Sequence, residues 1–202
     1  MGGFNGIFSV KGQFSGIDSD GLRKVYPVMG RHAEVIEERN LRAVCVLAKR
    51  AGGESRLAVS ADGKTHLFLE GEIFNLDEVR GRKSLSPAQG CLTLFLEDRM
   101  EELEKLNGSF ALIILDTRVS PRLVLVTDRL CTRPIYLFQK GDGCYFSTHM
   151  AALLSFPQVG SHLCKQGLVE FFAVRRTSLD HTLYENVRVV PPASIWSFDG
   201  RA

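Results

Sequence analysis

The sequence contains no long apolar run and no targeting segment. Nowhere in its 202 residues does an uninterrupted apolar stretch approach the ~18 residues that a membrane-spanning helix needs. Its first residues, MGGFNGIFSV, have neither the basic flank nor the apolar centre of a signal peptide. We therefore expect a cytoplasmic protein that has no membrane partner.

An excess of one charge is also missing. The chain has 25 basic and 23 acidic residues, a formal net charge of +2, and no long run of one sign. Nucleic-acid-binding domains usually show a clustered basic face, so we expect no nucleic-acid partner. Apolar residues make up 45% of the chain and charged residues 24%, which is close to the soluble average and allows a packed core.

Metal and redox signatures are absent as well. The five cysteines are widely spaced and include no C-x-x-C pair, which predicts free thiols in a reducing compartment. The five histidines lack metal-ligand spacing, so no metal site is expected. No P-loop-like ATP signature occurs, and we expect this chain to hold no cofactor of its own.

The apolar pattern predicts more strands than helices. The nearly continuous apolar run over 110–116, FALIILD, is typical of a strand buried on both faces. Lys140-Gly141-Asp142-Gly143 predicts a hairpin turn between two further strands. Other strands are predicted over 4–10, 42–49, 65–69, 122–127 and 194–198, and helices over 88–106, 149–156 and 165–174. Because strands come in runs, the expected class is α+β, as one domain over residues 1–202.

Two of the predicted helices carry apolar residues at helical spacing. The first stripe should be core rather than a partner-binding groove, and it comprises Leu92, Phe95, Leu96, Leu103 and Leu106. The segment 165–174 has its own apolar side, formed by Leu168, Val169, Phe171 and Phe172.

Four blocks, in the same order, resemble the amidotransferase domain of asparagine synthetases. They are Gly3-Phe4-Asn5-Gly6-Ile7-Phe8, Glu70-Gly71-Glu72-Ile73-Phe74-Asn75, LNGSFALIILD with VTDRLCTRPIYLF, and Tyr145-Phe146-Ser147-Thr148-His149. The tail TLYENVRVVPPASIW also resembles the segment that closes the family's domain. The chain is thus similar to the class II glutamine amidotransferases. This resemblance implies the N-terminal-nucleophile fold, an αββα sandwich of two antiparallel sheets between helical layers.

The same resemblance indicates that the catalytic residues are missing. The family hydrolyses glutamine with an N-terminal cysteine whose own α-amino group is the base. Gly2 stands at this nucleophile position and has no side chain. Glu70 stands where the family has an oxyanion-hole asparagine, and an ionised carboxylate can only accept hydrogen bonds. No catalytic residue is therefore expected to be intact.

Part of the family's substrate site is retained. Gly71 and Glu72 match their counterparts, and Glu72 lies where the family contacts the amino group of glutamine. Arg50 is the candidate for the arginine that holds the substrate carboxylate. Arg56 is the second choice, because Arg56-Leu57-Ala58-Val59 resembles the family's strand segment. A further family aspartate should fall near Pro87 or Ala88, where this chain has no acid.

The third block also contains a cysteine. Cys131 follows Asp128-Arg129-Leu130, at a position where the family has glycine. No histidine or acid is evidently tied to it, so we expect a structural residue and not a substitute nucleophile. Asp128 and Arg129 are expected to form a turn and an ion pair.

These observations predict a domain of an asparagine synthetase-related protein that lacks glutaminase activity. It would serve as a scaffold or a vestigial amino-acid pocket beside an ATP-dependent amide-forming domain, in cis or in trans. ATP and Mg are expected only in that C-terminal synthetase domain, which is absent from this chain, and a homodimer is the other partner considered. Two alternatives stay open: an active glutaminase domain whose cysteine was replaced, and an amino-acid-binding module that uses Arg50, Gly71 and Glu72.

Overall fold

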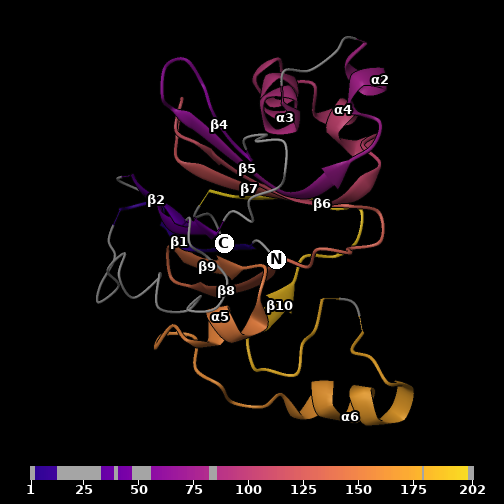
Figure 1. Ribbon diagram of the computed structural model, residues 1–202. Helices are drawn as coiled ribbons and strands as arrows, with labels where there is room; N and C mark the ends of the chain where they lie inside the picture. Colours follow the sequence, from indigo (N-terminus) through magenta and orange to yellow (C-terminus); the bar gives the residue numbers. More distant parts are fainter. Residues whose placement is uncertain are drawn as a thin grey trace.

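The computed structural model describes residues 3–12, 33–38, 41–46, 56–81, 86–178 and 180–199, with the backbone alone for 33–38 and 41–46. Two antiparallel sheets lie face to face, with helices outside each sheet (Figure 1). The chain therefore forms the αββα sandwich that the resemblance implied.

The first sheet has the strand order β10-β8-β9-β1-β3-β2. Its strands are β1 (Gly3–Ser9), β2 (Ala33–Glu38), β3 (Leu41–Val46), β8 (Tyr136–Lys140), β9 (Gly143–Ser147) and β10 (Val187–Val189). β1 lies at the centre, between β9 and β3, and pairs Asn5 with Ser147 on one side and with Val44 on the other. The start of β1 is thereby held in the middle of this sheet.

The second sheet has the strand order β11-β7-β6-β5-β4. Its strands are β4 (Leu57–Val59), β5 (Thr65–Ile73), β6 (Gly108–Asp116), β7 (Arg122–Thr127) and β11 (Ile195–Phe198). β5 and β6 pair along their whole length, from Thr65 opposite Asp116 to Ile73 opposite Gly108.

The main core fills the space between the sheets. Alternate residues of each strand point to the same face, and those facing inward form one apolar cluster. It includes Phe4, Phe8, Phe68, Ile113, Leu125, Leu137 and Phe146. The rings of Phe4 and Phe68 meet edge to face across the two sheets, with centroids 6.0 Å apart. This contact ties the start of β1 to the middle of β5.

Helices cover the outer faces. The second sheet is covered by α2 (Leu76–Arg80), α3 (Pro87–Leu96) and α4 (Met100–Glu104), which lie together above it (Figure 1). Ser86 caps α3 by accepting a hydrogen bond from the Gln89 amide, and Pro87 occupies the first turn, where a missing amide hydrogen costs nothing. On the first sheet, α5 (Met150–Leu154) packs through Ala152 and Leu153.

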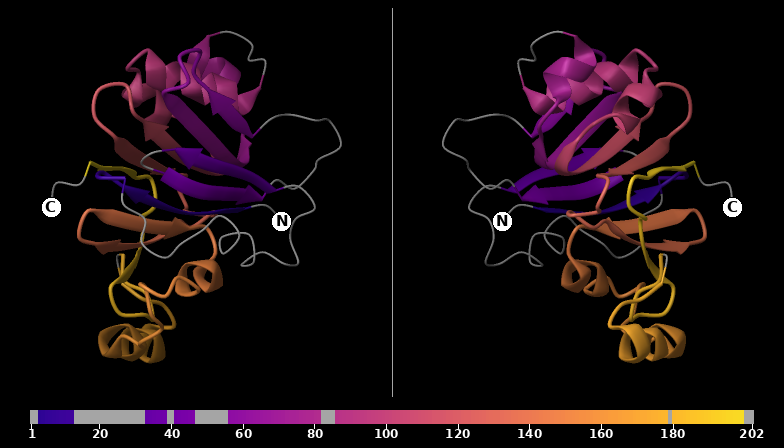
Figure 2. Two further views of the ribbon diagram at one scale, coloured as in Figure 1. Left: turned by 90° about the vertical axis from the view of Figure 1, so that its left-hand side faces the viewer. Right: turned by 90° about the vertical axis from the view of Figure 1, so that its right-hand side faces the viewer.

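The remaining helix, α6 (Lys165–Val174), stands apart from both sheets at one end of the molecule in Figure 1 and in both views of Figure 2. Its bounds are those predicted, but its apolar side is not covered: Val169 is 68% exposed and Phe172 is 78% exposed. The stripe from Leu92 to Leu106 behaves as predicted, because Leu92, Phe95, Leu103 and Leu106 are all buried.

Other predictions agree with the structure. The apolar run is strand β6, and the Lys140–Gly143 turn joins β8 to β9 in a hairpin. The region 88–106 forms two helices, α3 and α4. Cys91, Cys131, Cys144 and Cys164 are free thiols.

No helix in the described part of the chain is long and apolar enough to cross a membrane.

Candidate functional site

Four segments meet where β1 begins. The Phe4 amide donates to the Thr148 hydroxyl at 3.0 Å, and the Thr148 amide donates to the Phe4 carbonyl at 3.1 Å. Ser147, at the end of β9, adds a hydroxyl that donates to the same Phe4 carbonyl at 3.0 Å. These bonds hold Thr148 and His149, which follow β9, directly against the first residues of β1.

Gly3 leaves no room for a side chain. A Cβ atom added there would lie 2.8 Å from the His149 Nε2 and also 2.8 Å from the Thr148 Oγ1, a separation that real Cβ atoms essentially never show. A side chain at this glycine of the first sequence block would therefore force the side chains of Thr148 and His149 to shift. The role of the glycine is to let β1 and His149 approach each other.

Glu70 lies between the two sheets. It is only 6% exposed, and it points to the same face of β5 as Phe68, two residues before it. The Arg133 Nη1 lies 3.7 Å from the Glu70 Oε1, and the Thr148 hydroxyl hydrogen-bonds to the Glu70 carboxylate. Among the residues that the structure describes, the Glu70 Oε2 and the Arg133 Nε have no hydrogen-bond partner.

The charge on Glu70 is poorly supported by this environment. Burial raises the pKa of the Glu70 carboxyl above its ordinary value, and this effect outweighs the Thr148 hydrogen bond and the charge of Arg133, which act to lower it. A buried charge is costly unless it is paired and fully hydrogen-bonded. At the position of the family's asparagine, the chain therefore presents a buried carboxyl group with a raised pKa and without the amide NH2 donor of asparagine.

Gly71 has a conformation that requires glycine. Its φ is +95°, and a Cβ atom there would lie 1.9 Å from the Ser109 carbonyl oxygen on β6. The Arg56 Nη1 donates to the Gly71 carbonyl at 3.3 Å. The structure thus brings together Arg56, the second choice for the carboxylate-binding arginine, and Gly71.

The loop after β7 is organised by Asp128. Its carboxylate accepts from the Phe110 amide at 3.1 Å, from the Leu130 amide at 2.9 Å and from the Thr132 hydroxyl at 2.6 Å. Burial opposes ionisation of Asp128, but the hydrogen bonds from Thr132, Leu130 and Phe110 outweigh it and lower the pKa.

The predicted turn at Asp128 is confirmed, but the predicted Asp128–Arg129 ion pair is wrong. Asp128 instead accepts hydrogen bonds from amides and from Thr132. Arg129 lines a separate cavity of about 140 Å³ between α4, β7 and β11, together with Glu104, Leu106, Thr127 and Ser194. The carboxylate is therefore used to shape the backbone of the loop that leads to Arg133.

Cys131 has the features of a structural residue. Its φ is +51°, which matches a position where glycine is the usual residue. Its thiol contacts the Val190 carbonyl at 3.5 Å. Burial, followed by the negative charge of Asp128, raises the pKa of the thiol, so the nucleophilic thiolate is disfavoured.

The other candidates are placed as follows. Gly2 and Arg50 lie outside the described residues. Glu72 is exposed at the end of β5. Ala88 belongs to α3 and is fully buried in the apolar layer between this helix and the second sheet. It lies on the other face of that sheet from Glu70, so this position supplies no acid to the site.

Residues that the motifs contained but did not single out turn out to surround Glu70. Arg133 was part of the third block, and Thr148 and His149 were part of the fourth. The only sequence signal for Arg133 was its place just before Pro134, in a block otherwise typical of the family. Asn5 was also missed: it is fully buried, and both polar atoms of its side chain lack a partner in the part of the chain that the structure describes.

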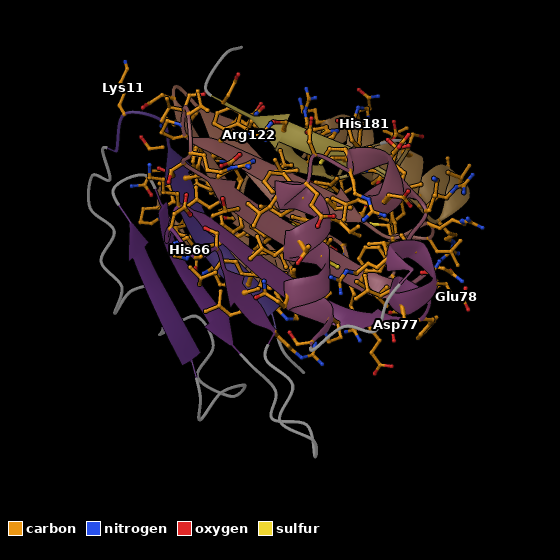
Figure 3. The ribbon with its side chains drawn as sticks, turned by 90° about the horizontal axis from the view of Figure 1, so that it is seen from above. Lys11, His66, Asp77, Glu78, Arg122 and His181 are labelled. Carbon is orange, nitrogen blue, oxygen red and sulfur yellow. The ribbon has the colours of Figure 1, made fainter. Side chains whose placement is uncertain are left out.

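Metal-binding groups do not gather anywhere in the ranges that the structure describes. No cluster of three or more histidine, cysteine, aspartate or glutamate residues could hold an ion there. His66 and His181 lie well apart, as Figure 3 shows from above.

Comparison with known proteins agrees with this geometry. A family model described as a glutamine amidotransferase domain matches residues 43–202. This chain belongs to that family. The domain is 23% identical over 181 residues to asparagine synthetase [glutamine-hydrolyzing] 3 of Bacillus subtilis (strain 168), a match that covers 85% of this chain and 29% of the relative.

Two solved structures share the domain's fold. One is titled the allosteric regulatory enzyme of purine biosynthesis (TM-score 0.55, 15% identity, 98% of this chain and 47% of that chain). The other is glutamine phosphoribosylpyrophosphate amidotransferase from B. subtilis in complex with ADP and GMP (TM-score 0.50, 14% identity, 100% of this chain and 49% of that chain). The domain therefore spans less than half of each of these three proteins, and it has the N-terminal-nucleophile amidotransferase fold.

Proposed function

We propose that this domain does not hydrolyse glutamine and that it acts as a scaffold beside an ATP-dependent amide-forming domain. The observation that carries the proposal is the Glu70 carboxylate, buried at the position of the oxyanion-hole asparagine. An oxyanion hole works by directing donors at the negative charge that develops on the substrate oxygen. A buried acceptor at this point opposes that charge.

Two further features support the loss of activity. Gly2, directly before β1, has no nucleophilic atom, and Ala88 supplies no carboxylate to the site. Removing a single oxyanion donor costs about 10²–10³ in rate. Loss of the nucleophile and the donor together therefore predicts no glutamine turnover.

A glutaminase assay on four proteins tests the proposal: the wild type, Gly2→Cys, Glu70→Asn and the double variant. Glutamate and ammonia release are measured with glutamine as the only substrate, after mass spectrometry has shown that Met1 is removed from each protein. We expect no release by the wild type or by Glu70→Asn, which lack a thiol, and release by Gly2→Cys at least about 10²-fold slower than by the double variant, because a thiol alone does not restore the donor. Turnover by Gly2→Cys as fast as that of the double variant would contradict the proposal and favour an otherwise intact glutaminase whose cysteine was replaced.

The partner is proposed from the relatives. The curated relative is named as a glutamine-hydrolysing asparagine synthetase, and this chain covers 29% of its length. The remainder of a similar protein, in cis or as a separate chain, is the proposed amide-forming partner and the place where ATP and Mg would bind. The partner domain and its ATP and Mg site are part of the proposal. A cytoplasmic location is proposed as well.

A second candidate function is recognition of a free amino acid without turnover. It is favoured by the hydrogen bond from the Arg56 guanidinium to the Gly71 carbonyl, which places a basic group beside two retained family residues, Gly71 and Glu72. Isothermal titration calorimetry with a panel of amino acids tests it. Heat that is lost in Arg56→Ala supports the candidate, and the absence of heat with every member of the panel contradicts it.

A further inference from the structure

The apolar side of α6 is uncovered in the folded domain. Phe172 is 78% exposed, Val169 is 68% exposed and Val174 is 59% exposed, while Leu163, just before the helix, is 53% exposed. Gly167 is the only residue of α6 that is buried. Helices with an apolar side normally turn it toward a core, and contiguous exposed apolar residues mark interaction sites.

The helix is anchored by its opposite side. Gly167 lies so close to the Thr182 backbone that a Cβ atom would be 2.3 Å from the Thr182 carbonyl oxygen. Glu170 accepts from the Ser178 amide at 2.7 Å and lies 3.4 Å from the His181 Nδ1. These contacts hold α6 in place, so the helix presents Val169 and Phe172 outward while Gly167 stays against the domain.

The outward residues have the spacing of a helix-packing ridge. Val169, Phe172 and Ala173 follow the i, i+3, i+4 pattern, and all three are exposed. Residues at this spacing lie side by side on one helix face, and such ridges fit between the side chains of another helix. In Figures 1 and 2 this helix projects from one end of the domain, where a partner has access.

Charge around this ridge is basic. Lys165, Arg175 and Arg176 are exposed, and none of the three forms an ion pair within the described ranges. The only acid between them, Glu170, is directed at Ser178 and His181. The ridge is thus bordered by cations at both ends.

This charge pattern opposes a second copy of the same helix. An antiparallel pair would place Lys165 near Arg175 and Arg176 of the other copy, and a parallel pair would place each cation near itself. Like charges at such contacts are destabilising. A membrane surface also fits poorly, since helices that lie on membranes carry lysine and arginine along their polar face, whereas the cations of α6 stand only at its two ends.

We propose that α6 is a docking helix for a protein partner that lays an amphipathic helix across Val169, Phe172 and Ala173. The partner's helix has an apolar stripe flanked by glutamate or aspartate, which would pair with Lys165, Arg175 and Arg176. The apolar contact supplies affinity, and the charges select the partner and its orientation. The proposal is independent of whether the domain hydrolyses glutamine.

Fluorescence anisotropy with a synthetic peptide tests the surface. The probe is a labelled peptide of about 18 residues, long enough to be helical alone, with leucine at i, i+3, i+4 and i+7 and glutamate on both sides. We expect saturable binding to the wild type that weakens as salt rises. Phe172→Asp should weaken it at least tenfold, and Arg175→Glu with Arg176→Glu should also weaken it.

Matched controls make the result specific. Val119→Asp introduces the same charge at another exposed apolar residue, in the β6–β7 turn, and it should bind as the wild type does. Circular dichroism should show equal folding of all variants. A second peptide carries lysine in place of every glutamate and should not bind.

Four results would overturn the proposal. Two concern the peptides: equal binding of both peptides to the wild type, or undiminished binding of the acidic peptide to Phe172→Asp. The third is self-association of the wild type in analytical ultracentrifugation that Phe172→Asp abolishes. The fourth is binding to phosphatidylserine vesicles without binding to the acidic peptide.

Discussion

The Arg133 guanidinium lies 3.7 Å from the Glu70 carboxylate, and these two residues come from different segments that the fold brings together. Arg133 remains 41% exposed in its side chain, whereas the Glu70 side chain is only 7% exposed. The pair is therefore uneven: the cation keeps much of its hydration, and the carboxylate loses most of its own. This imbalance carries the first prediction.

Replacing Glu70 by glutamine should stabilise the domain at neutral pH, by about 1 kcal/mol. Glutamine keeps an acceptor for Thr148 and removes the buried charge. Because the pKa of Glu70 in the folded state is raised above its ordinary value of 4.5, ionisation destabilises the fold at neutral pH, and this cost disappears as the pH falls through the folded-state pKa. The gain should therefore shrink toward acid pH.

Urea unfolding of wild type and Glu70→Gln at several pH values measures this gain. Glu101→Gln, at an exposed residue of α4, is the control and should change the free energy of unfolding by less than about 0.5 kcal/mol. A loss of stability in Glu70→Gln at neutral pH would mean that the Arg133 pair outweighs the burial of the carboxylate.

Gly71→Ala should destabilise the domain by roughly 3 kcal/mol or more. The added methyl group meets the Ser109 carbonyl oxygen on the paired strand, and the φ of +95° is strained for alanine. Gly63→Ala is the matched control, because its φ of +71° is also positive but no atom lies within 4 Å of its Cβ position. Its cost should be about 1–2 kcal/mol. Equal melting temperatures for the two variants would show that the strands separate easily at Gly71.

Asp116→Asn should cost about 1–2 kcal/mol at neutral pH, since its two arginine partners stay partly hydrated. The Arg118 Nε lies 2.9 Å and the Arg122 Nη2 lies 3.0 Å from the buried carboxylate. Both guanidinium groups also lie over the Phe95 ring of α3, at 5.4 and 5.2 Å from its centroid. Asp116 thereby links the turn between β6 and β7 to the helical layer.

The effect of Asp116→Asn should vanish in acid. Burial opposes ionisation of Asp116, but the hydrogen bonds from Arg118 and Arg122 outweigh it, so the folded-state pKa is lowered below the ordinary 3.8. The stabilisation is present above pH 3.8 and is lost as the pH falls through the folded-state pKa. Thermal melts from neutral to acid pH check this. Glu97→Gln, which removes an exposed ion pair with Arg99, should have little effect at any pH.

Gly167→Ala should loosen α6 and leave the rest of the fold intact. The added methyl group cannot fit against the Thr182 carbonyl, while the two sheets and their core do not depend on this helix. Hydrogen exchange of residues 165–174 should accelerate about tenfold, a change of ~1.4 kcal/mol in local opening, with a small change in melting temperature. Lys165→Ala, at an exposed position two residues earlier, should leave exchange nearly unchanged. Protection of α6 equal to the wild type would show that the helix is held by other contacts.

Local sequence patterns were sufficient for the central strands and most helices. The apolar run of β6 and the glycine-containing turn between β8 and β9 are local signals. The strands β2 and β10 were not predicted, and both lie at sheet edges. An edge strand pairs on one side only and can be short or polar, as in the three-residue β4 and β10. Such strands form because a neighbour pairs with them, which no local pattern reveals.

The sequence by itself determined the family and the residue types at the site. Block order placed Glu70, Gly71 and Glu72 in the second block and Gly3 in the first. The strands predicted over 65–69 and 4–10 did not include these residues, and the structure extends β5 to Ile73 and begins β1 at Gly3. The sequence could not identify Arg133 and Thr148 as the partners of Glu70, because these residues meet only when two different sheets stack. It also could not show that Asp128 is used by Phe110 and Thr132 instead of Arg129.

For α6, helical periodicity correctly predicted the bounds and the apolar side. Only the tertiary structure decided that Gly167 faces the domain and that Val169 and Phe172 face away. Periodicity defines which residues share a helix face, but the contacts around the helix decide which face is buried. Here the close approach of Gly167 to the Thr182 backbone makes that choice.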